Sequence, residues 1–364
     1  MGVSAKSMKV TQDDTPMMQQ YRGIKKEYSD SILFFRMGDF YEMFNEDAKT
    51  ASGILQIALT ARNKKTNPVP MCGIPHHSAN LYITKLLKAG KKVAICEQTE
   101  DPKQAKGLVK REVVRVITPG TILDDNILDP KKDQFIASVY FGKNQIGLAA
   151  LDVSTGVFKV TQIDGENTLS LLADELQKLD PKEIIIPSSI KEETQPWLPA
   201  GEVFVHTGED WTFSFSEAYR NLVEHFKTQS LEGFGCENME AAISSAGALI
   251  HYLRETQKSA MEHITALTLF PINDYMAVDQ CTLASLELVQ SSEGSRKNSL
   301  LDLLDLSHTP MGARRIREWI LKPLIDAEKI RERLNIVADF KDNPTERKHL
   351  RDLLKNIFEI GRAH

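Results

Sequence analysis

Apolar positions follow two spacings along the first 125 residues, and together they predict a mixed α/β domain. Short apolar runs favour strands, and apolar residues every three to four positions favour helices. The expected strands are 32–37, 93–96 and 113–117, and the expected helices are 15–28, 46–57 and 80–89. Residues 38–39 are expected to form a turn, 40–44 an apolar-rich segment and 63–70 a loop with two prolines. The polar residues 1–14 are expected to form a flexible tail.

The second part of the chain predicts another α/β domain, followed by a helical one. Apolar segments at 135–141, 146–153 and 157–163 predict a three-strand meander, and a helix at 168–179 and a strand at 183–186 follow it. This order is typical of a ribonuclease H-like domain, whose last helix we expect at 239–256. From residue 272 onward apolar residues recur at helical spacing, including 331–340 and 346–358. The fold class is therefore multidomain α/β plus all-α. We expect a mixed α/β domain at 15–125, a ribonuclease H-like α/β domain at 126–262 and an incomplete helical domain at 263–364.

Composition narrows the class of protein without identifying a function. The chain is 41% hydrophobic and 26% charged, as in an ordinary globular protein. It has no apolar run near the roughly 18–20 residues of a membrane span and no signal-peptide region. The four cysteines, at 72, 96, 236 and 281, lie too far apart for a disulfide framework or a paired zinc motif. We expect a cytoplasmic protein without a membrane segment.

Charge is distributed unevenly along the chain. The net charge is −5, yet residues 62–115 hold 12 Lys and Arg against 4 Asp and Glu. A basic stretch inside an acidic chain favours a local site for a polyanion. A lysine-rich surface that only contacts water is the alternative, and charge alone does not decide between them.

Several motifs occur in one order along nearly the whole chain. They are TPMMQQY at 15–21, RMGDFYEMF at 36–44, PMCGIPHH at 70–77, VAICEQ at 93–98, RVITPGT at 115–121, TPMGARR at 309–315 and WILKPL at 319–324. Together they resemble the MutS family of bacterial DNA mismatch repair proteins, and the motif at 36–44 resembles the mismatch-binding signature of that family.

The resemblance implies a mismatch-binding domain, a connector domain and the start of a helical core and lever domain. It also implies a clamp and an ATPase domain in the full-length family protein, where ATP and Mg²⁺ would bind. We expect both domains to be absent here, because the chain contains no G-x-x-x-x-G-K-[ST] loop. The partners implied are mismatched double-stranded DNA, a second subunit in a homodimer and the downstream repair protein MutL, at the bacterial nucleoid. Residues 360–364 match the translation of a common sequencing adapter, which leaves a truncated read and a natural terminus as alternatives.

Phe40 and Glu42 are the central candidate residues. By the resemblance, Phe40 is a wedge that enters the minor groove and tests how readily the duplex kinks, because mismatched steps stack poorly. Glu42 would then hydrogen-bond the base stacked on Phe40, in protonated form where that base offers only an acceptor. In an extended segment the two side chains share one face and leave Tyr41 and Met43 for packing. On composition alone, Phe40 would be a core residue.

The remaining candidates are less specific. The basic residues Arg62, Lys64 and Lys65 lie on an expected loop and suit phosphate binding. Met37 and Met71 could pack on the sugar edge, although a buried methionine is the commoner fate. The adjacent pair His76 and His77 has no further ligand nearby, so no metal site is expected.

Two rival functions remain. Asp152 could be the metal-binding carboxylate of a ribonuclease H-like nuclease, but it falls on the second strand of that domain and lacks a convincing set of partner carboxylates. The chain could also be a structural fragment that docks a partner. We expect a DNA-binding module with no catalytic residue, no bound metal and no cofactor of its own.

Overall fold

The computed structural model describes residues 15–62, 68–100, 107–122, 129–193, 197–199, 203–258 and 261–357. Contacts divide the chain into two compact units. The first contains residues up to Pro119 together with a short segment at Thr256–Ser259, and the second contains Gly120–Glu255 and the remainder. The mixed α/β plus helical class predicted from the pattern is confirmed. No helix within the described ranges combines the length and apolar character that a membrane crossing requires.

The first unit is built on a six-stranded mixed sheet with the order β3-β4-β2-β1-β5-β6. Its strands are β1 (Ser31–Met37), β2 (Phe40–Phe44), β3 (Thr60–Arg62), β4 (Val69–Pro75), β5 (Lys92–Gln98) and β6 (Arg111–Ile117). The helices of this unit are α1 (Pro16–Glu27), α2 (Asn45–Leu55) and α3 (Ala79–Lys88), with a short 3-10 turn η1 (His76–Ser78) before α3. In this sheet β1 and β5 pair in parallel, and the other neighbouring strands pair antiparallel.

Local sequence explains the main boundaries of the first unit. Pro16 stands in the first turn of α1, where its missing N–H costs no hydrogen bond. β1 carries five consecutive buried residues and therefore lies inside the sheet. Gly38, at φ +58°, makes the tight turn into β2. The turn is held by His76, whose backbone N–H donates to the Asp39 carbonyl at 2.9 Å.

The second unit contains another six-stranded sheet, with the order β11-β10-β7-β8-β9-β12. Its strands are β7 (Phe135–Phe141), β8 (Gln145–Asp152), β9 (Val157–Asp164), β10 (Glu183–Pro187), β11 (Phe204–Gly208) and β12 (Thr268–Leu269). The helices that cover it are α4 (Thr168–Leu179), α5 (Phe215–Phe226) and α6 (Glu240–Gln257), and the short 3-10 turns are η2 (Ser188–Glu193), η3 (Asp210–Phe213) and η4 (Glu232–Phe234).

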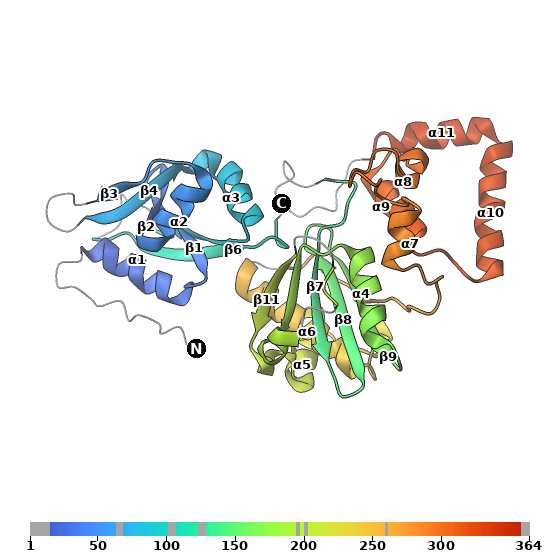
Figure 1. The fold of residues 1–364 in the computed structure, drawn as a ribbon, viewed down its shortest axis with the longest axis horizontal. Helices are drawn as coiled ribbons and strands as arrows, with labels where there is room; N and C mark the ends of the chain where they lie inside the picture. The colour runs from blue at the N-terminus through green and yellow to red at the C-terminus, as the bar shows by residue number, and fades with distance from the viewer. Residues whose placement is uncertain are drawn as a thin grey trace. The chain divides into compact units, whose positions relative to one another are not determined.

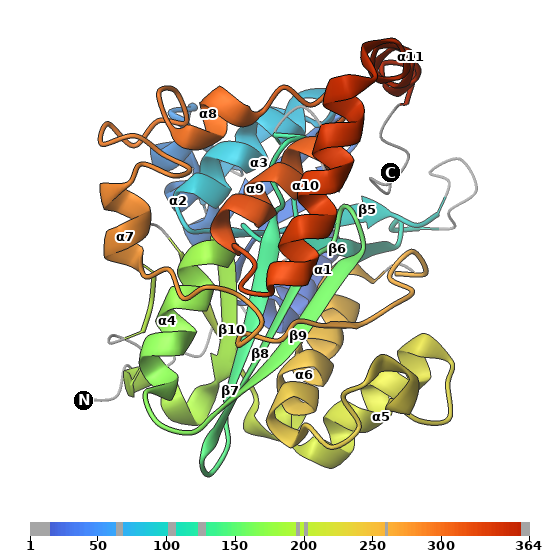
Figure 2. The same cartoon turned by 90° about the vertical axis from the view of Figure 1, so that its right-hand side faces the viewer.

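Both faces of this second sheet are packed. One core joins the sheet to α5 and α6, and a separate core joins it to α4, as Figure 2 shows from the positions of these helices. The first helix–sheet contact is very close: a Cβ on Gly147 in β8 would lie 1.8 Å from the Ala241 carbonyl oxygen of α6. β8 is accordingly buried from Ile146 to Asp152.

The chain then continues as helices. These are α7 (Gln280–Ser285), α8 (Leu300–Leu304), α9 (Pro310–Leu321), α10 (Ala327–Asp342) and α11 (Pro344–Leu354). Side chains of Asp279, Ser299, Thr309 and Asp326 accept backbone N–H groups at the starts of the first four helices, which satisfies donors that have no partner within the helix. No residue of α10 or α11 is buried among those that the structure describes.

Most expected elements lie within two residues of their predicted ends, but some were missed or misplaced. β4 begins at Val69, so the end of the expected loop at 63–70 is wrong, and residues 63–67 lie outside the described part. β3, β11 and α5 had not been predicted. Figure 1 and Figure 2 both show α5 next to α6 in the second unit. The expected tail at 1–14 and the expected domain border at 125–126 also lie outside the described residues.

Candidate nucleic-acid interface

Strand register gathers the described candidate residues on one face of the first sheet. Phe40 pairs with Met37 on one side, and Phe44 pairs with Met71 on the other. Arg62 of β3 lies two residues after Thr60, which also pairs with Met71. Because directly paired and alternate residues share a face, these side chains project on the same side of the sheet as Phe40 and Glu42. Lys64 and Lys65 lie outside the described residues.

Phe40 is exposed although its neighbours in β2 are buried. Its side chain is 48% exposed, whereas Tyr41 and Met43 are buried on the opposite face. The expected alternation along β2 is therefore confirmed, and Phe40 is not a core residue. On the buried face, the Tyr41 hydroxyl donates to Glu97, which also pairs with Arg36 at 3.6 Å. These contacts fix β2 from below and leave the Phe40 ring accessible to solvent.

Glu42 lies beside Phe40 in a partly buried position with one cationic partner. Its Oε2 accepts from Arg62 Nη1 at 3.3 Å, and the side chain is 19% exposed. Burial raises the pKa of the Glu42 carboxyl above its ordinary value, while the nearby Arg62 and Arg111 charges oppose that rise. Burial therefore favours the neutral form of the carboxyl relative to a glutamate in water.

Met37 and Met71 flank this face as half-buried residues. Both pack against the core that α1 and the sheet share. Their structural role is therefore visible, and the part of each side chain that remains accessible lies on the candidate face. Packing against a core, the usual role of methionine, is thus visible for both residues.

Arg111 is a residue of this face that the sequence analysis missed. It is 7% exposed, and its Nη1 donates to Gln20 Oε1 of α1 at 3.1 Å. Its Nε donates to the Arg36 carbonyl at 2.8 Å, and its guanidinium lies 5.0 Å from the Phe35 ring centroid. This buried cation stabilises the strand end that carries Met37 and adds positive potential near Glu42. In the sequence it stands between Lys110 and Glu112, which is typical of a solvated charge run.

The adjacent histidines His76 and His77 make contacts within the protein. His76 Nδ1 lies 3.1 Å from the Asp39 carbonyl oxygen, so the ring helps to hold the β1–β2 turn. The two imidazole rings meet edge to face with centroids 5.8 Å apart. Within the described ranges, no three His, Cys, Asp or Glu side chains converge as a metal ion would require.

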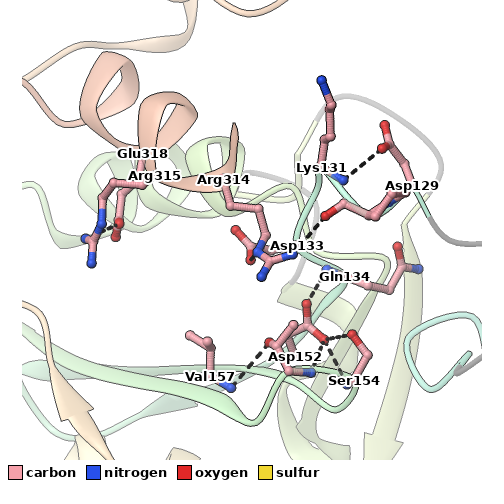
Figure 3. Close-up of polar contacts among 12 residues, drawn as sticks. Asp129, Lys131, Asp133, Gln134, Asp152, Ser154, Val157, Arg314, Arg315 and Glu318 are labelled. Carbon is pink, nitrogen blue, oxygen red and sulfur yellow. Dashed lines mark hydrogen bonds and ion pairs between the residues drawn. The ribbon is translucent and has the colours of Figure 1, made fainter. Parts of the chain in front are cut away.

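Asp152 is a structural residue at the end of β8. It is fully buried, and Figure 3 shows its carboxylate among short polar contacts. One oxygen accepts from Gln134 N at 2.9 Å, and the other accepts from Ser154 N at 2.9 Å and Ser154 Oγ at 2.6 Å. A nearby acid, Asp133, has a pKa raised by burial and by the Asp152 charge and pairs with Arg314 at 3.4 Å. Because both oxygens of Asp152 are occupied, the arrangement does not favour a nuclease.

Comparison with known proteins gives three family matches in chain order. Residues 15–126 match MutS domain I, residues 134–265 match MutS domain II and residues 281–363 match MutS domain III. The DNA mismatch repair protein MutS of Halothermothrix orenii is 47% identical over 356 residues, which make up 96% of this chain and 39% of that protein. The DNA mismatch repair protein MutS of Desulforapulum autotrophicum is 45% identical over 358 residues, 96% of this chain and 40% of that protein. The chain spans about two fifths of the length of these curated relatives.

Proposed function

Since the chain belongs to the MutS family, we propose that it binds mismatched duplex DNA in DNA mismatch repair, through the face of the first sheet that carries Phe40. The observation that carries this proposal is an exposed phenylalanine on a strand whose other apolar residues are buried, next to a partly buried carboxyl. Single exposed aromatics are common, but this one lies within the motif at 36–44.

The proposed mechanism is a mechanical test of the duplex. Phe40 enters from the minor groove and unstacks one step, which costs a few kcal/mol, and stacking on the ring returns roughly 1–3 kcal/mol. The balance favours insertion where stacking is already weak, at a mismatch or a small unpaired loop. Phe40 can act in this way because β2 is fixed beneath it by Tyr41 and Glu97.

Glu42 selects the kinked state in this proposal by a hydrogen bond to the base on Phe40. The ionised carboxylate accepts from a base donor, and the protonated carboxyl, which burial favours, donates to a base acceptor. Close to matched DNA the ionised carboxylate meets phosphate repulsion without that hydrogen bond. Met37 and Met71 would contact the sugar edge, and Lys64 and Lys65 the phosphates.

The domain assignment is part of the same proposal. We assign residues 15–125 to a mismatch-binding domain, 126–262 to a ribonuclease H-like connector and 263–364 to part of a helical core and lever domain. The order of strands β7 to β10 around α4 supports the connector assignment.

ATP, Mg²⁺, homodimer formation and contact with MutL belong to the complete family protein in this proposal, acting at the nucleoid. The residues of this chain do not fit an ATP site, because it has no G-x-x-x-x-G-K-[ST] loop. No step assigned to this chain therefore runs through ATP, and we propose that it acts as a binding module.

The test is a titration of the chain with a G·T duplex, a duplex with one unpaired base and a matched duplex, at two salt concentrations. We expect tighter binding to the two defective duplexes. Phe40→Ala should lower the preference by roughly 10- to 100-fold, the equivalent of the stacking energy. Trp211→Ala is the matched control, because that side chain is 54% exposed and lies in the second unit.

Salt separates this mechanism from simple charge attraction. Phosphate contacts weaken steeply as salt rises, for matched and mismatched duplexes alike. The ratio between them should stay nearly constant if Phe40 reads deformability. Equal mismatched-to-matched binding ratios in the wild-type chain and in Phe40→Ala would contradict the proposal. A chain that binds a protein partner but has no affinity for DNA would favour the docking alternative.

A further inference from the structure

Arg62 forms an ion pair with Glu42, whereas its sequence context predicts a contact with phosphate. The ion pair indicates a different role for this residue. We propose that Arg62 is a positioning residue that acts on DNA through Glu42: it holds one carboxylate oxygen and leaves the other directed to the base on Phe40. This inference rests on the proposed function, because it names what sets the specificity of the same site.

The two residues meet across an intervening strand. Arg62 lies on β3 and Glu42 on β2, with β4 between them, and Nη1 lies 3.3 Å from Oε2. The β4 residue paired with Glu42 is Gly73. Gly73 has no side chain that could stand between the two, and a Cβ there would lie 3.7 Å from Glu42 Cγ, at ordinary van der Waals distance.

A second contact limits the freedom of the Arg62 guanidinium. Its central carbon lies 6.0 Å from the centroid of the Phe44 ring, within the range of a cation–π interaction. Phe44 is fully buried, so the ring is a fixed support. The guanidinium is therefore held between a rigid aromatic ring and the carboxylate, whereas a lysine at this position would offer neither the planar stack nor the fork of donors.

Among the residues that the structure describes, two charged side chains act on the Glu42 carboxyl. Arg62 faces it from β3 and Arg111 from β6, and both lower its pKa against the effect of burial. The paired residues on β1 and β4, Phe35 and Gly73, carry no charge. No described donor contacts Oε1 of Glu42, so Arg62 occupies one carboxylate oxygen only.

Phosphate binding by Arg62 would conflict with this arrangement. If the guanidinium left for a phosphate, the partly buried Glu42 would lose its partner while further negative charge approached it. Paired with Glu42, Arg62 instead offsets the repulsion between the carboxylate and the DNA backbone. It thereby sets the fraction of Glu42 that is ionised, and so which mismatched bases the carboxyl can bind.

The first experiment needs no DNA. The Glu42 carboxyl is titrated by NMR with selectively labelled glutamate in the wild-type chain, Arg62→Gln and Arg62→Lys. We expect the midpoint to move up in Arg62→Gln and to return most of the way in Arg62→Lys. An unchanged midpoint in Arg62→Gln would overturn the inference, whatever the DNA measurements give.

The second experiment is a double-mutant cycle on the mismatch-to-matched binding ratio across pH. Arg62→Gln should move the pH dependence of the ratio upward and lower the ratio at neutral pH by about two- to fivefold, the range of a partly exposed ion pair. In a Glu42→Gln background the same change should have no further effect. Lys110→Gln is the control, since Lys110 is 60% exposed and pairs with the exposed Glu112.

A phosphate contact would give a different result. Arg62→Gln would then weaken binding to both duplexes equally and lower the salt dependence of binding by the equivalent of about one phosphate contact. Its effect would also add to that of Glu42→Gln. This pattern would overturn the inference. If the wild-type chain shows no preference for a mismatch, the proposed function fails, and the NMR titration still decides whether Arg62 controls Glu42.

Discussion

The first and the second sheet each have six strands, yet they place a strand carboxylate in opposite surroundings. In the second sheet, Asp152 is fully buried and its two oxygens accept several hydrogen bonds from the neighbouring loop and turn. In the first sheet, Glu42 remains partly exposed with one described partner, next to an exposed phenylalanine.

The difference separates an acid that maintains a fold from one available for binding. A carboxylate whose acceptor positions are filled by backbone N–H groups has no remaining capacity for a ligand. A carboxylate with one free oxygen and a raised pKa has that capacity and can change its protonation state. Both acids were candidates in the sequence, and only their hydrogen-bond partners distinguish them.

The largest expected effect is on the free energy of unfolding, where the two phenylalanines of β2 should differ. Phe44→Ala should destabilise the first unit by about 3–5 kcal/mol, because the ring is fully buried and a cavity would remain. Phe40→Ala should cost less than about 1 kcal/mol, because that ring is 48% exposed. Denaturant unfolding curves of the two variants measure this, and similar losses would show that Phe40 packs as a core residue.

The next effect concerns Asp152. Asp152→Ala should destabilise the second unit by on the order of 3 kcal/mol, because it leaves buried backbone donors without an acceptor. The control is Asp164→Ala at the exposed end of β9, which should change stability by less than about 0.5 kcal/mol. A neutral effect at Asp152, combined with a loss of metal-dependent cleavage, would revive the nuclease alternative.

The smallest effect is a pH dependence at Glu42. Its folded-state pKa is raised by burial, so ionisation of Glu42 lowers the stability of the folded chain. Glu42→Gln should therefore be slightly more stable than the wild type at neutral pH, by less than about 1 kcal/mol. The difference should shrink as pH falls through the folded pKa toward the unfolded value near 4.3, where the wild-type carboxyl is also neutral. Unfolding curves at several pH values test this, and a difference that grows on acidification would show a lowered pKa instead.

Periodicity located most of the fold. Residues 168–179 were predicted with the observed ends of α4, and the alternation of Phe40, Tyr41 and Glu42 follows from strand geometry alone. α5 was missed although Phe215, Tyr219, Leu222 and Phe226 recur at helical spacing, so its signal was present. The start of β4 was placed in a loop because Pro68 and Pro70 disfavour a strand in sequence.

The site was less accessible from sequence than the fold. The pairing of Arg62 with Glu42 depends on β3 and β4, and their register was not predicted. Arg111 was missed because nothing in its local sequence distinguishes a buried guanidinium from a solvated one. Its burial results from contacts with Gln20 and Arg36, both more than seventy positions away.

The two-residue turn at Gly38 and Asp39 has a consequence for how this segment can vary. Its length sets the parity of β2: with one residue more, Tyr41 and Met43 would exchange sides with Phe40 and Glu42. Substitutions within the turn can be absorbed as long as a residue at φ +58° is tolerated, but insertions or deletions of a single codon cannot. In a library of variants with turns of different length, only those that gain an even number of residues should therefore retain function. The length of the turn thus decides whether the ring of Phe40 or that of Tyr41 faces outward.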